Sequence, residues 1–584
     1  MSVYSTVPIM RPKRSRFPLK CNFRTTCNIG EITPTCRPIE CVPGDTMYLK
    51  QVTSVDLTPL VAPFKGDLYL ESWAFFGSNQ LLYNEDVDQG KFSDILLGAS
   101  DPSKSIPLPS WDYWTDADST GYKSIWSQFG NQTNIDITAF SDPSTEKVKV
   151  CPYPKRLYNM SFNEYFRDEN LQNEVDLEND DILKINYKKD RFTSAFLTPQ
   201  KGNTISLKLS GVGKVKFTEG SVAPLLQSIM ELKTLEDFNG TATAGRIVKV
   251  APQLSTTGTN PVVYHQKWSK VTDQHMENLN LALQGAATST FNNLQSMDVT
   301  SNDGWNGNGV NFAKLGNNAS DLITWLNTHN TFDFADATTF TLEDLRLLNK
   351  LQKWQERNQL CGSRYKEYLI ANYGIAPNDE TLQRPVLIGH IKTPIIVNSV
   401  LQHDPSTNSP QGTKVGNGIG LQTVNFGKWT SKEFGWIIIV SALRPKASYQ
   451  QGVHRSLLKD TVYDYLNPIF QSLGQEEIKN NELYFTGLAS DENSPWGYTD
   501  RYNSYRYLED ITTGSLRKSS LESWSVSRKF ANRPTLSSQF IQVEATEYDY
   551  LFAVPSTTED TCIISAHNYI DAIRPLSKYA MPSL

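Results

Sequence analysis

The chain has 584 residues, of which 39% are hydrophobic, 11% aromatic and 20% charged, and its formal net charge is −6. This balance excludes a disordered polyelectrolyte, and a chain with net negative charge is not, as a whole, a binder of polyanions. No stretch reaches the roughly 20 apolar residues that span a bilayer, and the first residues lack the apolar core of an export signal. We therefore expect an unexported chain without membrane insertion.

The first predicted element is an extended basic arm over residues 1–30. It carries six bases and no acid before Glu31, and three prolines deny it a helix. One interpretation is contact with nucleic acid, with the cations on phosphates and the interleaved rings stacked on bases. The alternative is a solvated tail, or a strand that pairs with or braces neighbouring subunits from inside. The candidate nucleic-acid-binding residues are Arg11, Lys13, Arg14, Arg16, Phe17, Lys20, Phe23 and Arg24.

Most of the remaining pattern is typical of β-strands. Apolar alternation or runs rich in β-branched and aromatic residues predict strands at Asp67–Phe75, Ile205–Phe217, Arg246–Val250, Gly435–Leu443, Ser523–Phe530 and Phe540–Val554. These runs lie far apart in the sequence, so their pairing is mostly non-local. That spacing favours a sandwich of antiparallel strands with long insertions over a βαβ repeat.

Three helices are predicted between the strands. The first begins at an N-cap, Thr341, and continues to Gly362; the second covers Tyr365–Tyr373 and ends at Gly374, where a left-handed cap is expected. The third covers His454–Leu466 and ends before Pro468. Core packing explains the apolar stripes of these helices, and none of them contains a cofactor motif.

A polar section over residues 218–340 lies between the strands predicted before residue 218 and the helices and strands predicted from residue 341 onward. Within it, residues 301–320 contain ten Asn or Gly, which cannot hold the interior of a strand or helix. We interpret 218–340 as an insertion displayed on the surface, because long ordered insertions are usually functional. It divides the body into a first part, 31–217, and a second part, 341–584.

The sequence offers little catalytic or metal-binding chemistry. It has no G-x-S-x-G, H-E-x-x-H or P-loop motif, and its seven histidines are far apart, so we predict no enzyme and no catalytic residue. No C-x2-C pair exists among the seven cysteines, which we expect to be free thiols. Carboxylates crowd residues 168–181; a solvated acidic face is the expected explanation, and a structural divalent cation the alternative. No cofactor is otherwise expected.

Seven segments resemble one known family. The segment Cys151–Asn173 (CPYPKRLYNMSFNEYFRDENLQN) closely resembles a signature of the major capsid proteins of gokushoviruses, which are circular single-stranded DNA phages of the microvirus group. Further segments similar to that family are Asp190–Gly202, Pro43–Thr46, Thr341–Asn358 with Gly362–Tyr365, Ser409–Gly412, Tyr449–Gly452 and Ile573–Leu584. They extend from about residue 40 to the C-terminus. One departure is Arg191, which stands where the family has a tyrosine.

The resemblance implies an eight-stranded antiparallel jelly roll with long loop insertions and a few short helices. It further implies that sixty copies, built from pentamers, form a T=1 shell around the DNA, assembled in the bacterial host cytoplasm. The insertion would form a threefold protrusion that attaches to a host receptor. Sixty chains of charge −6 carry −360 charges, so a small basic DNA-associated protein and counterions would have to neutralise the genome, beside phage assembly factors.

Two alternatives come from other functional classes. The aromatic content and Trp305, in the Asn- and Gly-rich stretch, are compatible with a glycan-binding or glycan-cleaving β-sandwich. The basic arm alone is compatible with a monomeric single-stranded DNA-binding protein. Neither alternative explains the seven family-like segments.

Overall fold

The computed structural model divides the chain into two units, residues 1–203 with 353–584 and residues 204–352. The structure describes residues 13–84, 92–97, 111–112, 123–131, 149–202, 212–213, 332–333, 342–401, 412–487, 491–506, 508–518 and 520–579. In the second unit this covers the two-residue strands β8 (Val212–Gly213) and β9 (Phe332–Asp333), which pair, and the start of α10. The predicted insertion 218–340 lies almost wholly outside the described residues, and its boundaries stay a prediction.

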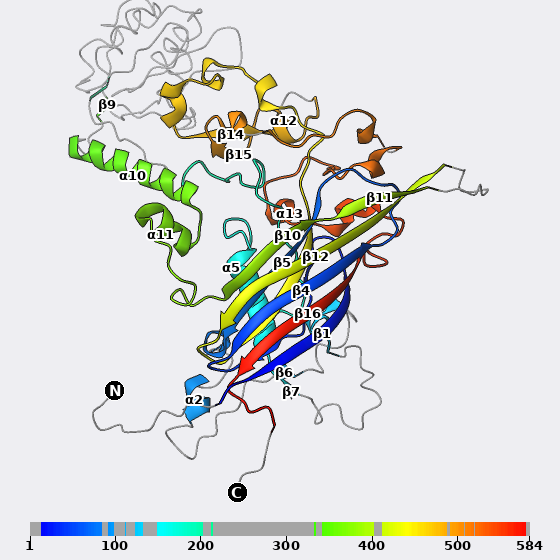
Figure 1. The fold of residues 1–584 in the computed structure, drawn as a ribbon. Helices are drawn as coiled ribbons and strands as arrows, with labels where there is room; N and C mark the ends of the chain where they lie inside the picture. Colours follow the sequence, from blue (N-terminus) through cyan, green and yellow to red (C-terminus); the bar gives the residue numbers. More distant parts are fainter. Residues whose placement is uncertain are drawn as a thin grey trace, which may run out of the picture. The chain divides into compact units, whose positions relative to one another are not determined.

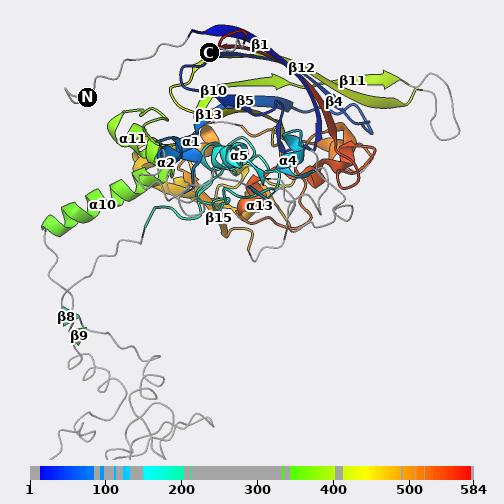
Figure 2. The same cartoon turned by 90° about the horizontal axis from the view of Figure 1, so that it is seen from below.

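The first unit is built on two antiparallel sheets packed as a sandwich (Figures 1 and 2). In order across it, sheet I contains β1 (Ser15–Cys27), β16 (Cys562–Arg574), β4 (Thr46–Leu57), β12 (Lys414–Thr430) and β11 (Ile396–Leu401). Sheet II contains β10 (Val386–Pro394), β5 (Leu68–Ser78), β13 (Gly435–Pro445) and β2 (Ile32–Pro34), and β3 (Ile39–Cys41) also pairs with β13.

The strand order is that of a jelly roll. For this comparison the strands of the sandwich are renumbered from 1 to 8 in chain order. The pair β2 and β3 counts as one interrupted strand, number 2, and β10 with β11 as one strand, number 5, that changes sheets at Ile395. The order is then 1-8-3-6 across sheet I and 2-7-4-5 across sheet II. The predicted mainly β, antiparallel fold is confirmed. The count of eight strands depends on this merging and stays a prediction.

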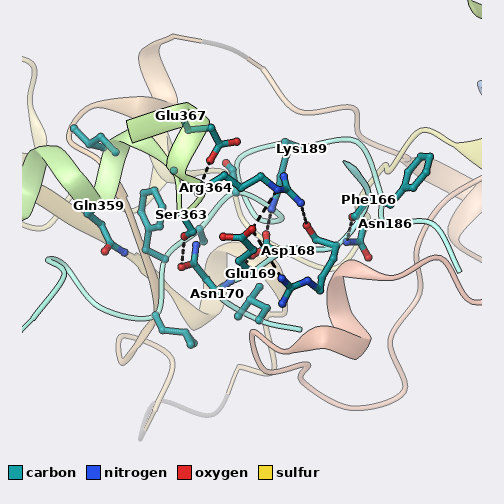
Figure 3. Close-up of a pocket in the computed structure, with 18 of the residues that line it drawn as sticks. Phe166, Asp168, Glu169, Asn170, Asn186, Lys189, Gln359, Ser363, Arg364 and Glu367 are labelled. Carbon is teal, nitrogen blue, oxygen red and sulfur yellow. Dashed lines mark hydrogen bonds and ion pairs between the residues drawn. The ribbon is translucent and has the colours of Figure 1, made fainter. Parts of the chain in front are cut away.

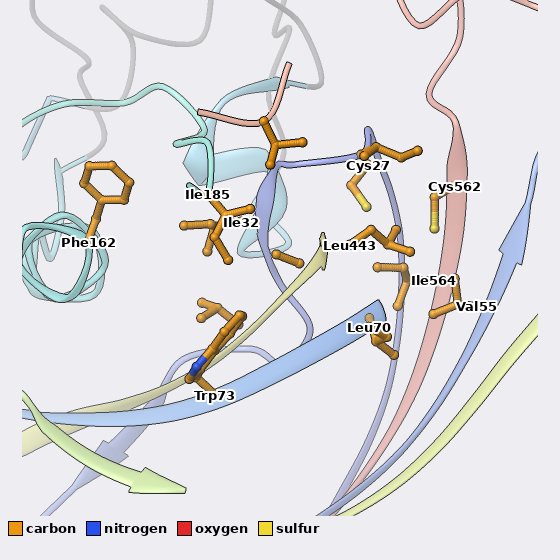
Figure 4. Close-up of a cluster of buried hydrophobic side chains, with 14 of the residues drawn as sticks. Cys27, Ile32, Val55, Leu70, Trp73, Phe162, Ile185, Leu443, Cys562 and Ile564 are labelled. Carbon is orange, nitrogen blue, oxygen red and sulfur yellow. The ribbon is translucent and has the colours of Figure 1, made fainter. Parts of the chain in front are cut away.

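Two apolar clusters hold the sandwich together. One lies between the sheets and includes Met47, Phe76, Val424 and Ile570. The other continues from the sheets to the helix α5 (Tyr153–Tyr165), which lies on the opposite side of sheet II from sheet I. Figure 4 shows part of this second cluster, with Cys27 and Cys562 side by side at paired positions of β1 and β16. None of the seven cysteines forms a disulfide.

Apart from the 20-residue α10, the other described elements are short. The helices are α1 (Asn79–Leu82), α2 (Phe92–Leu97), α4 (Ile125–Gln128), α10 (Leu342–Cys361), α11 (Tyr365–Tyr373), α12 (Asn480–Leu483) and α13 (Ser538–Ile541). Two small strand pairs complete the set: β6 (Trp111–Asp112) with β7 (Lys149–Val150), and β14 (Gln475–Lys479) with β15 (Pro495–Asp500). A third cluster, around Phe192, Trp496 and Phe540, packs the loops near β14 and β15. Within the described ranges, no helix is both long enough and apolar enough to cross a membrane.

Several sequence-based predictions are confirmed. The strands at Asp67–Phe75 and Gly435–Leu443 are β5 and β13, and the first two helices are α10 and α11. Gly374 caps α11 in the left-handed region, with φ of 71°. The residue proposed as N-cap of α10, Thr341, lies outside the described residues, as does the predicted strand Arg246–Val250; of Ile205–Phe217 only Val212–Gly213 is described, as β8.

Three predictions are wrong. His454–Leu466 forms only short 3-10 turns, because Asp464 accepts hydrogen bonds from the backbone N–H groups of Asp460 and Thr461 and so competes with helical pairing. Phe540–Val554 contains the end of α13 and the 3-10 helix Ala545–Leu551 instead of a strand. Ser523–Phe530 begins within the 3-10 helix Glu522–Trp524 and then makes isolated bridges, Ser525 with Lys65 and Arg528 with Tyr449, instead of a continuous strand. The side-chain hydroxyl of Tyr550 bonds the backbone of Ser525 and Ser527 between these bridges.

Candidate nucleic-acid interface

The predicted basic arm is in large part an edge strand of sheet I. Ser15–Cys27 forms β1, which pairs with β16 over its whole length, so the segment is extended as expected. Lys13 and Arg14 precede it and are exposed, and Arg11 lies outside the described residues. Because side chains alternate along a strand, the candidate residues of β1 are divided between its two faces.

The division separates the cations from the rings. Arg16, Lys20 and Arg24 share the face of sheet I that points away from sheet II, whereas Phe17 and Phe23 share the other face with the buried Cys27. The structure therefore does not bring those phenylalanines together with the cations. Stacking of Phe17 or Phe23 on the same nucleic acid that the cations contact has no geometric support.

The cations of β1 instead join side chains from three other strands. We call this outward surface of sheet I the basic face; in the described part of the chain no helix covers it (Figure 2). In addition to the β1 cations, its charged and aromatic residues are Tyr48, Lys50 and Asp56 of β4, Lys428 of β12, and His567, Tyr569 and Asp571 of β16. It thus has five cations and two carboxylates, although the chain as a whole is negative.

The strand register places a tyrosine between two lysines. Lys20 and Lys50 both pair with Tyr569, one from each side, and the ammonium of Lys20 lies 6.0 Å from the centre of the tyrosine ring. One strand further along, Tyr48 lies between Asp571 and Lys428. Each tyrosine is 44% exposed, so a ring face is available to a ligand. Cations alternating with exposed rings are what a single-stranded nucleic acid requires.

Arg16 differs from the other four cations. Its guanidinium lies 2.5 Å from a carboxylate oxygen of Asp571, and this hydrogen bond raises the pKa of Arg16. Among the described residues, Lys20, Arg24, Lys50 and Lys428 have no ion-pair partner. They are the groups of the basic face that can bind phosphate without first breaking an ion pair.

Sequence reasoning missed the residues contributed by β4, β12 and β16. In β4 the inward positions include the polar Gln51 and Thr53, and in β12 they include Gly416, Gly418 and Gly420, so the apolar alternation is interrupted. The glycines are required by close packing: a Cβ on Gly416 would lie 2.6 Å from the carbonyl oxygen of Ala62. Alternation of the polar outward residues was the signal that remained in β4.

Part of the crowded acidic segment forms ion pairs, whereas Glu174, Asp176 and Asp181 are exposed, as a solvated face requires. On α5, Lys155 is fully buried and lies 3.1 Å from Glu178 and 3.0 Å from Asp180, and the neighbouring Arg156 lies 2.6 Å from Glu178. The prediction of a solvated acidic face is therefore wrong for Glu178 and Asp180. In the described ranges, no cluster of His, Cys, Asp or Glu has the arrangement of a metal site.

Several family-like segments meet at a pocket of about 860 Å³ (Figure 3). Its carboxylates are engaged: Asp168 pairs with Lys189, and Glu169 lies 3.3 Å from Arg364. Glu367 accepts the backbone N–H of Arg364 at 3.1 Å. The Glu169–Arg364 pair joins residues 165–202 to the start of α11, and the side chain of Gln359 on α10 donates to the carbonyl oxygen of Thr198 at 3.3 Å.

A family model described as capsid protein (F protein) matches residues 5–584. The chain is also similar to three curated relatives, each called capsid protein VP1. That of Chlamydia phage 1 is 27% identical, over 100% of this chain and 97% of the relative. That of Bdellovibrio phage phiMH2K is 25% identical, over 99% and 97%, and that of Spiroplasma virus 4 is 23% identical, over 95% and 93%.

Proposed function

Because this chain belongs to the capsid protein (F protein) family, we propose that sixty copies of it form a T=1 icosahedral shell around a circular single-stranded DNA genome. The chain is a structural capsid protein of the microvirus group, and its place is the virion. The observation that carries the proposal is the family match over residues 5–584. The jelly-roll sandwich supports the proposal, because this architecture occurs in viral capsid domains. In a closed shell, symmetry repeats each contact between subunits.

The basic face of sheet I is the surface that meets the DNA. Its support is four cations that have no carboxylate partner within the described part of the chain, interleaved with Tyr48 and Tyr569. With a net charge of −6 per chain, the shell cannot neutralise the genome as a whole. A small basic DNA-associated protein and counterions supply the remaining positive charge, and phage assembly factors act with the subunit in the bacterial cytoplasm.

The insertion 218–340 forms the protrusion that binds a host receptor. Its composition supports an exposed position, because ten of residues 301–320 are Asn or Gly. Deleting 218–340 is expected to leave shells that no longer adsorb to host cells. Loss of all shells on deletion would contradict this placement of the insertion.

The subunit acts without catalysis or a cofactor, by association alone. The ion-paired carboxylates of the pocket and of Glu178 support this view over a glycan-cleaving enzyme or a structural cation site. Turnover of a glycan that is lost on replacing one carboxylate would overturn it.

The shell itself is tested by electron microscopy and mass measurement of particles from producing cells. Sixty chains of 65.8 kDa amount to about 3.9 MDa of protein. We expect closed icosahedral particles of that protein mass. Particles with another copy number would contradict the T=1 arrangement, and a purely monomeric chain in producing cells would contradict the shell.

A further inference from the structure

Residues 454–473 place large apolar side chains on the surface instead of in a core. The segment consists of three 3-10 turns, Arg455–Leu457, Val462–Asp464 and Pro468–Ser472, and precedes β14 in Figure 1. Seven of its apolar side chains are between 55% and 80% exposed: Leu457, Val462, Tyr463, Tyr465, Leu466, Ile469 and Leu473. We call these seven the apolar shelf.

The polar side chains of the segment hold it from beneath. Arg455 is buried, and its guanidinium lies 3.0 Å from Glu482 and 3.0 Å from Asp464. Asp464 in turn accepts the backbone N–H of Thr461 at 2.7 Å. Buried charged groups thus lie beneath exposed apolar side chains, although Ser456, Asp460 and Thr461 are exposed as well. The ion pairs fix the backbone in a conformation that presents the apolar shelf to the outside.

Aromatic contacts order the shelf further. The ring centres of Tyr463 and Phe470 lie 5.0 Å apart. The ammonium of Lys459 lies 4.4 Å from the ring centre of Tyr465 and 5.0 Å from that of Tyr505, and it donates to the Tyr505 hydroxyl at 2.6 Å. Rigid rings lose little conformational entropy on binding, and tyrosine is enriched in protein–protein interfaces.

The size of the shelf matches one side of a stable protein interface. At roughly 100 Å² for each partly exposed side chain, the seven residues present about 700 Å² of surface. A standard interface takes about 800 Å² from each partner. The summed area of the seven side chains is therefore close to the area that one partner contributes to such an interface.

We propose that the apolar shelf is a contact surface for a second copy of this chain within the shell, an inference that rests on the function proposed above. A copy of the chain fits better than DNA, because phosphates require cations and the seven side chains carry no charge. The partner copy covers the shelf and removes its apolar surface from water, which is the driving force of most protein association.

The test compares a shelf variant with a matched variant outside both the shelf and the basic face. The shelf variant is Leu457→Ser with Ile469→Ser; the control is Val61→Ser with Ile375→Ser, which also alters two exposed apolar residues. All are made in producing cells with the other phage proteins, and particles are counted after sedimentation. We expect at least a tenfold loss of particles for the shelf variant, with soluble subunits of unchanged circular dichroism, and near-normal yield for the control.

Hydrogen exchange on wild-type protein gives a second readout that needs no variant. We expect the amides of 454–473 to exchange at least tenfold more slowly in intact particles than in subunits dissociated from them. Normal yield from the shelf variant together with equal exchange rates would overturn the inference while leaving the shell intact. Absence of particles from wild-type cells would instead overturn the proposed function, and this inference with it.

Discussion

The basic face makes a quantitative prediction about salt. Replacing Lys20 and Lys50 by Gln removes the two cations on either side of Tyr569. Each phosphate contact on single-stranded DNA contributes about −0.7 to the slope of log K against log salt, so four unpaired cations give a slope of about −2.8. The double variant is expected to retain about −1.4. Between 50 and 200 mM salt, affinity then falls about 50-fold for wild type and about 7-fold for the variant.

The assay is fluorescence anisotropy of a labelled oligothymidine titrated with subunits dissociated from particles. A matched control replaces Lys432 and Lys529 by Gln, which gives the same change in net charge away from the basic face. The control should keep the wild-type slope. An unchanged slope for the Lys20 and Lys50 variant, or an equal loss of slope in the control, would show that these two lysines do not contact DNA phosphates.

Three further predictions concern stability and thiol chemistry. Glu482→Gln removes a carboxylate partner of the buried guanidiniums of Arg191 and Arg455 and should lower the free energy of unfolding by about 3–5 kcal/mol. The control Glu380→Gln, at an exposed ion pair, should lower it by less than about 1 kcal/mol. Both are measured by denaturant titration. Burial raises the pKa of Asp379, but its bonds from Lys366 and Arg384 outweigh burial and lower the pKa. The stabilisation by Asp379 is therefore present above the ordinary pKa of an aspartate and is lost as the pH falls below about 4. Asp379→Asn should flatten the dependence of unfolding free energy on pH in that range, and an unchanged dependence would contradict this. Burial raises the pKa of Cys36 to about 12, so mass spectrometry after maleimide treatment at pH 8 should find the exposed Cys151 labelled and Cys36 unlabelled until the protein unfolds.

An element of the fold could be predicted from the sequence where its hydrogen bonds and buried contacts are reflected in its own local residue pattern. The strand β13 was predictable because its apolar run is buried on both faces, and α11 because its glycine cap is local. The strand β12 was not predictable, because its inward position 416 must be glycine to fit against the backbone of Ala62, which is distant in the sequence. The predicted strand Ser523–Phe530 was wrong because its backbone bonds to Lys65, Tyr550 and the Ser448–Tyr449 segment in turn, and not to one continuous partner strand.

The candidate site was predictable only in part, for a related reason. The cations of β1 could be found because they crowd a short segment that lacks acids. Their partners Lys50 and Tyr569 come from strands more than 500 residues apart in the chain, and only sheet register brings them together. The register also separates Phe17 from the cations, which a one-dimensional pattern could not reveal without knowing which positions share a face.

Closure of the chain into a shell around DNA is best tested by sedimentation of native material from producing cells. Absorbance would be followed at 260 and 280 nm with and without nuclease. A DNA-filled shell gives one fast boundary whose absorbance at 260 nm is protected from nuclease. Only slow species in that material, or fast particles whose nucleic acid is fully digested, would contradict it.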